Sequence, residues 1–98
     1  MTISKTISGS SLTLALEGRL DTMTAPELED ELKKSLEGVD TLTMDFSKLD
    51  YISSAGLRVL LSAHKKMSAA GGMKIINVNE IVQEVFEVTG FSDILTIE

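Results

Sequence analysis

The segment Leu49-Asp50-Tyr51-Ile52-Ser53-Ser54-Ala55-Gly56-Leu57-Arg58-Val59-Leu60-Leu61 decides how this chain folds. It follows an alternating, strand-like run and opens a run of apolar residues at helical spacings. Two serines, Ser53 and Ser54, stand at the junction. Such a junction directs free backbone N–H groups and the positive end of the helix dipole at whatever lies in front of it. The serines therefore either cap the helix or carry a phosphate that this helix end would stabilise.

Upstream of this segment, the pattern predicts a β-hairpin and one helix. Apolar and polar residues alternate over residues 3–7 and 12–16, as in two half-buried strands, and residues 18–22 read as a loop. Thr24 and Glu27 form a predicted capping box with Pro26 in the first turn. The following helix carries leucines at intervals of four and ends at Gly38. Residues 41–46 alternate again and predict a third strand.

Downstream, a helix over residues 54–70 is predicted, with its buried stripe formed by Leu57, Leu60, Leu61, His64 and Met67. Residues 74–78 are nearly all apolar, which is typical of a strand covered on both faces. A third helix is then expected, followed by a final edge strand over residues 94–97. Asn79 is the expected N-cap of this third helix, and Gly90 is its expected left-handed end. The side of the helix expected to be buried carries Ile81, Val82, Val85, Phe86 and Thr89.

The predicted order β-β-α-β-α-β-α-β defines a single α/β domain over residues 1–98. Right-handed crossovers give a mixed sheet, with an N-terminal hairpin, a mostly parallel core and about three to four packed helices. Functional loops gather beyond the carboxyl ends of parallel strands. Residues 18–22 and 47–54 both meet this description, so we expect the two loops to be neighbours. Asp21 would then lie towards Ser53 and Ser54.

Composition excludes several classes of partner. Nine Lys and Arg against fifteen Asp and Glu give a net charge of −6, which disfavours nucleic acid and anionic membranes as partners. The chain has no cysteine, which excludes disulfides and thiolate metal sites and fits a reducing compartment. No signal core or membrane-length apolar run is present, so a cytoplasmic location is expected.

No catalytic constellation is visible. The pattern G-x-S-x-G is absent, and the single histidine, His64, lies two to three turns into the helix that the serines open. No metal-ligand set, P-loop or G-x-G-x-x-G is present, so we expect no enzyme, no metal and no cofactor. Local chemistry alone favours the serines as an N-cap worth about 1 kcal/mol. Arg58, one turn from them, is either a solvated residue or a partner for a phosphate.

Three motifs, in order, resemble the STAS domain of bacterial anti-sigma factor antagonists along essentially the full chain. Residues 18–21, G-R-L-D, are similar to the family's G-x-L-D segment before its first helix. Residues 46–57 are similar to the strand-to-helix segment that ends in D-S-[ST]-G-L. Gly71-Gly72 with the strand after it, and the helix end from Val85 to Phe91, are similar to the family's C-terminal half.

The resemblance implies a non-catalytic, phosphorylation-controlled binding switch that regulates transcription. In this family an anti-sigma factor that is also a serine kinase phosphorylates the serine two positions before the glycine, which is Ser54 here. The unphosphorylated antagonist binds the kinase and frees the sigma factor, phosphorylation blocks binding, and a serine phosphatase restores it. The resemblance also places Asp21 in the partner-facing patch, and we assign Ser53, Ser54, Gly56 and Arg58 to the same patch.

Two residues depart from the family pattern. Ser53 occupies the position of the motif aspartate, so it is the alternative acceptor, and Arg58 replaces a glycine and could alter partner choice. STAS domains also occur as partner subunits of lipid-transport ATPases and in other signalling complexes that need no phosphorylation. Such a subunit would be indifferent to Ser54→Asp and would co-purify with an ATPase.

Overall fold

The computed structural model describes residues 1–98 as five strands, three α-helices and one short 3-10 turn. In chain order, the elements are β1 (Thr2–Ser8), β2 (Ser11–Leu20), α1 (Ala25–Ser35), β3 (Thr41–Ile52), α2 (Ser54–Ser68), β4 (Met73–Ile76), α3 (Glu80–Thr89), η1 (Phe91–Asp93) and β5 (Thr96–Ile97). This order confirms the predicted α/β fold with an N-terminal hairpin and about three to four helices. None of the helices combines the length and apolar character needed to cross a membrane.

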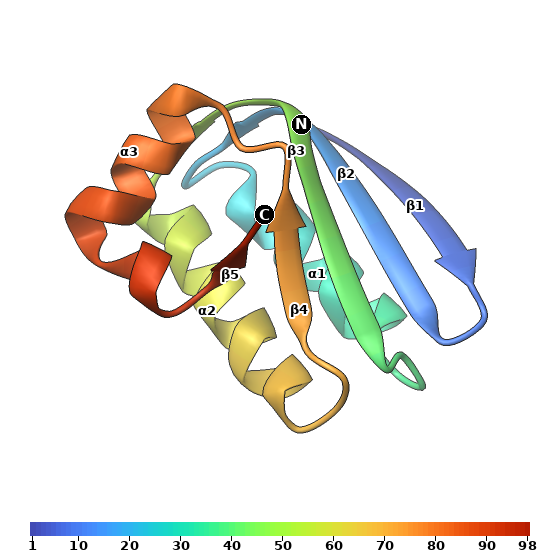
Figure 1. The fold of residues 1–98 in the computed structure, drawn as a ribbon. Coiled ribbons are helices and arrows are strands. Elements are labelled where there is room, and N and C mark those ends of the chain that lie inside the picture. Colours follow the sequence, from blue (N-terminus) through green and yellow to red (C-terminus); the bar gives the residue numbers. More distant parts are fainter.

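The sheet has the strand order β1-β2-β3-β4-β5, which is the order along the chain (Figure 1). β1 and β2 pair antiparallel, and every later pair is parallel. Because each right-handed crossover advances in the same direction across the sheet, each helix is delivered to the same face. On β2, β3 and β4 the strand residues on that face are buried, whereas those on the other face, such as Thr13, Thr43 and Lys74, are half-buried or exposed. The edge strand β1 has no buried residue, and Ile7, paired with the buried Leu12, is 62% exposed, so the prediction of a half-buried first strand is wrong.

One-sided covering corrects the prediction that the strand near residue 75 is buried on both faces. Met73 and Ile75 of β4 are buried against the helices, but Lys74 faces solvent. The strand is short and ends at Ile76, so the predicted run over residues 74–78 lies only partly within it. Asn77 follows it in the left-handed conformation with a φ of 60°.

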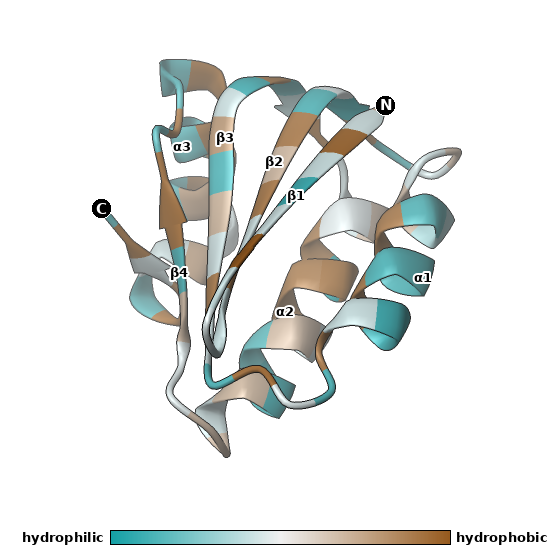
Figure 2. Ribbon diagram, turned by 90° about the vertical axis from the view of Figure 1, so that its right-hand side faces the viewer, coloured by the Kyte–Doolittle hydropathy of each residue, from teal (hydrophilic) through white to brown (hydrophobic).

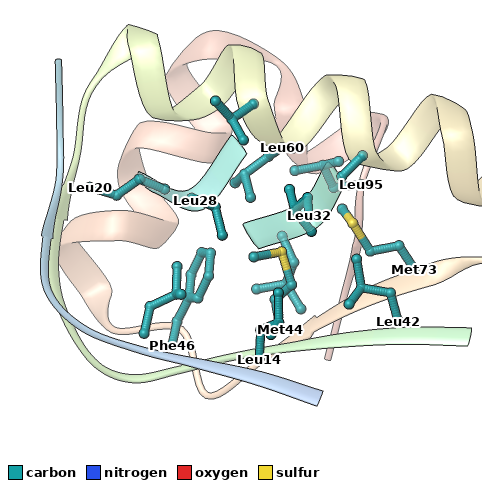
Figure 3. Close-up of a cluster of buried hydrophobic side chains, with 14 of the residues drawn as sticks. Leu14, Leu20, Leu28, Leu32, Leu42, Met44, Phe46, Leu60, Met73 and Leu95 are labelled. Atoms are coloured by element: carbon teal, nitrogen blue, oxygen red, sulfur yellow. The ribbon is translucent and has the colours of Figure 1, made fainter. Parts of the chain in front are cut away.

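The core lies between the helix-covered face of the sheet and the three helices. Figure 3 shows Leu14, Met44 and Phe46 of the sheet facing leucines that include Leu28 and Leu60. All five are completely buried. Hydropathy colouring shows a largely hydrophilic α1 beside a more apolar α2 (Figure 2), as expected for a helix at the margin and a helix over the centre of the sheet.

The two central strands are longer than predicted. β2 continues to Leu20 and β3 to Ile52, so most of residues 18–22 and 47–52 lie in strands rather than loops. Their pairing shifts register twice, between Ala15 and Glu17 and between Gly18 and Arg19, and β3 carries the additional residues. A bulge lets a strand continue where simple alternation is broken, which explains why the sequence pattern ended too early.

Burial on the helices differs from the predicted stripes. On α2, Val59 and Ala63 are buried, whereas Leu61 and His64 are only half-buried, because α1 packs along one side of α2. On α3, Val82 and Phe86 are buried, but Ile81 and Thr89 are exposed and Val85 is half-buried. A single stack of Phe86 on Phe46, with ring centroids 6.4 Å apart, fixes the side of α3 that faces the sheet.

The chain ends differently from the predicted final strand. Gly90 ends α3 in the left-handed conformation, as expected, but a 3-10 turn follows immediately. Ile94 is exposed after that turn, and Leu95 returns to the core. Only Thr96–Ile97 pairs with β4, so β5 is a two-residue edge strand.

Candidate functional site

The ends of β2 and β3 bring the predicted site residues together. Leu20 pairs with Ile52, and the Ser53 backbone N–H donates to the Leu20 carbonyl at 2.9 Å. Asp21 and Ser53 each follow the end of one of these strands. The prediction that Asp21 lies beside the serines is thereby confirmed.

The turn after β2 is built around Asp21 rather than around a capping box. Asp21 Oδ1 accepts from the backbone N–H groups of Met23 and Thr24, at 3.0 and 3.2 Å. The predicted cap, Thr24, makes no capping bond to α1. Its hydroxyl donates to the Arg19 carbonyl at 2.7 Å and accepts from the Asp21 N–H at 2.9 Å. Thr24 is thus engaged with the turn before it, which is why Glu27 has no partner in a capping box.

Electrostatics favour the ionised form of Asp21. Partial burial alone would raise the pKa of this carboxyl, but the hydrogen bonds from Thr24 and Met23 and the charge of Arg19 outweigh it and lower the pKa. Arg19 Nε lies 3.7 Å from Asp21 Oδ2, and its guanidinium stacks over the Tyr51 ring at 4.5 Å. The turn therefore presents a fixed negative charge beside the start of α2.

Helix α2 begins without a side-chain cap. Ser53 has the extended backbone of an N-cap residue, but its hydroxyl makes no capping bond. The oxygen is buried and has no hydrogen-bond partner. Asn79 of α3 shows the contrasting case, because its side-chain oxygen accepts from Val82 N–H at 2.8 Å and its amide donates to the Leu49 carbonyl at 2.8 Å. The interpretation of the serines as a bonded N-cap is therefore wrong for Ser53.

Ser54 is the first residue of α2 and is exposed. No side-chain cap bond satisfies the first N–H groups of the helix. Uncapped N–H groups and the helix dipole favour negative charge at this position. Of the two candidate acceptors, Ser54 is therefore accessible and suitably placed to carry a phosphate, whereas the Ser53 oxygen is enclosed.

Gly56 is a packing residue within the site. It is buried, and a Cβ atom there would lie 2.7 Å from Leu20 Cγ and 2.9 Å from Ile52 Cγ1. Only glycine lets the first turn of α2 approach the ends of β2 and β3 this closely. Gly56 thus positions the serines but does not itself lie on the surface.

Arg58 lies one turn after Ser54, is exposed and forms no ion pair. Helical side chains lean towards the N-terminus, so residues at i and i+4 meet. The guanidinium can therefore reach a group on Ser54.

Sequence reasoning missed two features of this site. Met23 is 83% exposed at the tip of the Asp21 turn, although it is a large apolar residue. Its position between the aspartate and the helix start was the only available signal. The stacking of Arg19 on Tyr51 was also missed, because it depends on the bulged register of the two strands.

The remaining chemistry of the chain lies elsewhere. His64 lines a cavity with Thr41 and Gly72, at the end of the sheet opposite the serines. No cluster of three potential metal ligands is present. The arrangement is a surface of polar, apolar and charged groups around one accessible serine, which suits recognition by another protein.

A parallel-cored sheet covered on one face, with a serine at the helix start after its third strand, defines a class of small regulatory binding domain. Residues 2–98 match the model of the STAS domain. The chain belongs to this family, among relatives that are anti-sigma factor antagonists.

Relatives of known description agree with this placement. BtrV of Bordetella bronchiseptica is 36% identical over 88 residues, which cover 88% of this chain and 76% of that protein. The anti-sigma-B factor antagonist of Bacillus subtilis is 30% identical over 83 residues, covering 84% and 76%. Antagonists of this kind act by binding another protein, so the chain is a binding protein and not an enzyme.

Solved structures show the same fold at lower identity. An anti-sigma factor antagonist from Mycobacterium paratuberculosis superposes with a TM-score of 0.89 at 20% identity, covering 98% of this chain and 83% of that one. The Bacillus cell fate determinant SpoIIAA, solved in its phosphorylated form, gives a TM-score of 0.76 at 17% identity, covering 99% and 91%.

Proposed function

We propose that this chain is an anti-sigma factor antagonist switched by phosphorylation of Ser54. Unphosphorylated, it binds an anti-sigma factor that is also a serine kinase and thereby frees a sigma factor in the cytoplasm. Phosphate on Ser54 releases the kinase, and a serine phosphatase resets the switch. The observation that carries the proposal is the exposed Ser54 hydroxyl at the uncapped start of α2, beside the Asp21 turn.

The physical cause of release is charge at a surface that must be desolvated. A phosphate adds about −1.5 to −2 charges at neutral pH. Asp21 is already ionised nearby, and the partner surface would have to take up the phosphate charge in addition to this carboxylate. Burying a charge without a partner costs several kcal/mol, so affinity should fall by at least about 100-fold.

The test is phosphorylation in lysate of the native host, followed by intact-mass analysis and site mapping. Wild-type protein should gain one phosphate, Ser54→Ala none, and Ser53→Ala one. Transfer to Ser53 would keep the switch but move its acceptor. No phosphate, in a lysate that phosphorylates another substrate, would reject the switch and favour the role of a transporter subunit.

A second measurement uses the kinase recovered with Ser54→Ala as bait. The alanine variant should bind constitutively, and Ser54→Asp should fold normally but bind weakly, because an acidic group is tolerated at a helix start. Equal affinity of the two variants would contradict the proposed mechanism of release.

A further inference from the structure

Helix α3 carries a row of apolar side chains that the core does not cover. Ile81 and Val88 are 60% and 80% exposed, and Val85 between them is half-buried. The three residues recur at i, i+4 and i+7, so they share one side of the helix, here called the α3 stripe. Val82 and Phe86, which are buried, lie on the neighbouring side that packs on the sheet. Adjoining exposed apolar side chains of this kind mark surfaces that bind another protein.

The α3 stripe lies on the side of α3 that faces α2. Helix α2 joins β3 to β4 and α3 joins β4 to β5 on the same face of the sheet, so the two helices are neighbours (Figure 1). Gln83 lines a cavity with Leu95 and Ile97, so its side of α3 faces β5. At about 100° per residue, the α3 stripe lies opposite Gln83 and therefore towards α2. By the same geometry, the half-buried Leu61 lies opposite Ala63, which lines a cavity with α1, and thus towards α3.

Opposite charges border this apolar centre on the two helices. Glu84 precedes Val88 by four residues on α3, so the two side chains are neighbours. Lys65 follows Leu61 by four residues on α2, with the same result. Helix α3 has three acidic residues and no basic one, and α2 has three basic residues and no acidic one. They are Glu80, Glu84 and Glu87 of α3 and Arg58, Lys65 and Lys66 of α2.

All six of these charged residues are exposed, and none forms an ion pair within the molecule. Of the nine lysines and arginines of the chain, three lie on α2, and five of the remaining six are ion-paired. The free cations are therefore concentrated on one helix, next to a helix whose carboxylates are also free.

The helix dipole does not account for this pattern. Negative charge is favourable in the first turn of a helix and positive charge in the last, which fits Glu80, Lys65 and Lys66. Glu87, however, lies in the last turn of α3, and Arg58 lies near the start of α2, where the dipole disfavours each charge. Nor does a dipole require an exposed apolar row between the charges. The arrangement is better explained by a complementary surface on another molecule.

We propose that this α2–α3 face, which comprises the α3 stripe, Leu61 and the six charged residues, binds the same face of a second copy of the chain. In a symmetric dimer each surface meets its own image. A two-fold axis along the boundary between the helices places the basic α2 of each copy against the acidic α3 of the other, with the apolar stripes enclosed between them. A face with equal and opposite charged borders is complementary to itself, which is the reason for choosing a second copy as its occupant.

The first experiment measures the mass of the full chain by analytical ultracentrifugation. Over about 10 to 500 µM, the mass should rise from that of a monomer towards twice that value. Val88→Ser changes a side chain outside the core and occurs twice in a symmetric dimer, so it should weaken association at least about tenfold. Ile7→Ser is the matched control, because Ile7 is also a large exposed apolar residue but lies on β1. It should leave the dissociation constant within about twofold.

The second experiment reverses the charge of one helix at a time. One variant carries Arg58→Glu and Lys65→Glu on α2, and the other carries Glu84→Lys and Glu87→Lys on α3. Each variant alone should be monomeric, because like charges then face each other at both contacts of the dimer. Mixed in equal amounts, the two variants should associate as a heterodimer, because each reversed helix now meets a helix of opposite charge. High salt should weaken this heterodimer.

Three outcomes would overturn the proposal. A wild-type chain that stays monomeric throughout would leave the α2–α3 face to a different partner protein. A dimer that withstands Val88→Ser and both charge reversals would lie elsewhere, for example at the edge strand β1. Two folded variants that stay monomeric when mixed would show that the opposite charges do not face each other. None of these measurements involves a kinase or phosphate on Ser54, so the dimer and the proposed function are tested independently.

Discussion

Replacing Gly56 by alanine should destabilise the fold through collisions with two identifiable side chains. The added Cβ would lie 2.7 Å from Leu20 Cγ and 2.9 Å from Ile52 Cγ1. Both side chains are almost completely buried, at 0% and 1% exposure, so neither can rotate into open space. Overpacking of this kind costs about 1 to 3 kcal/mol. Alanine recovers up to about 1 kcal/mol of helix propensity, which leaves a net loss of about 1 kcal/mol at the middle of that range.

Urea unfolding followed by far-UV circular dichroism measures this loss. With a slope of about 1.5 kcal/mol/M, unchanged by the substitution, the midpoint should fall by about 0.7 M. Ser54→Ala, two residues earlier on the same helix but exposed, is the matched control and should stay within about 0.5 kcal/mol.

A double-mutant cycle tests the cause of the loss. Leu20→Ala removes the Cγ atom that the new Cβ would meet, at its own cost of about 2 to 5 kcal/mol. In that background the contact with Ile52 Cγ1 at 2.9 Å remains. Gly56→Ala should therefore cost less than in the wild type by about 0.5 kcal/mol or more, which is the expected coupling energy. If Gly56→Ala is neutral in the wild type, or equally costly in both backgrounds, the close approach of α2 to the strand ends is not what requires glycine.

Three further predictions concern the caps, the Asp21 turn and Gly71. Ser53→Ala should change the free energy of unfolding by less than about 0.5 kcal/mol, because the Ser53 hydroxyl makes no capping bond. Asn79→Ala removes a capping bond and should cost about 1 to 2 kcal/mol. Equal losses of the two variants in urea unfolding would contradict this contrast. Because the pKa of Asp21 is lowered in the folded state, its stabilising contribution is present above the pH at which the unfolded carboxyl titrates and is lost as pH falls through the folded value. Arg19→Gln should raise the Asp21 pKa slightly in a carboxyl NMR titration, and a pKa that falls would show that the ion pair has been misassigned. Gly71→Ala should destabilise more than Gly56→Ala, because its Cβ would meet the backbone carbonyl of residue 40 at 2.5 Å; a smaller loss would mean that the preceding turn yields easily.

The type and order of the regular elements could be predicted because they depend on local pattern. Apolar residues alternate with a period of two over residues 12–16 and 41–46, and these segments lie in β2 and β3. After Ser54 the apolar residues recur with a period near 3.6, and this segment forms α2. Strand ends could not be predicted in the same way. The continuation of β3 to Ile52 depends on a bulge, and a bulge is a relation between two strands rather than a property of either.

Proximity within the site was predictable, but its contacts were not. Parallel neighbouring strands end at the same edge of a sheet, so Asp21 had to approach Ser53. Whether the serine hydroxyl reaches a backbone N–H depends on one rotamer, and here it does not. The need for glycine at position 56 likewise depends on Leu20, which lies 36 residues earlier in the chain.

The agreement between strand order and chain order has a consequence for biosynthesis. Each strand pairs with the one synthesised just before it (Figure 1), so the emerging chain adds to a template that already exists. Synthesis proceeds at about 5 to 20 residues per second, and β-hairpins form in about 1 to 10 µs, so each unit has time to form before the next is complete. The Asp21 turn and the two serines belong to the segment up to α2. The site of the proposed switch can thus form on the ribosome before β4, α3 and β5 exist, and the last third of the chain then completes the edge of the sheet.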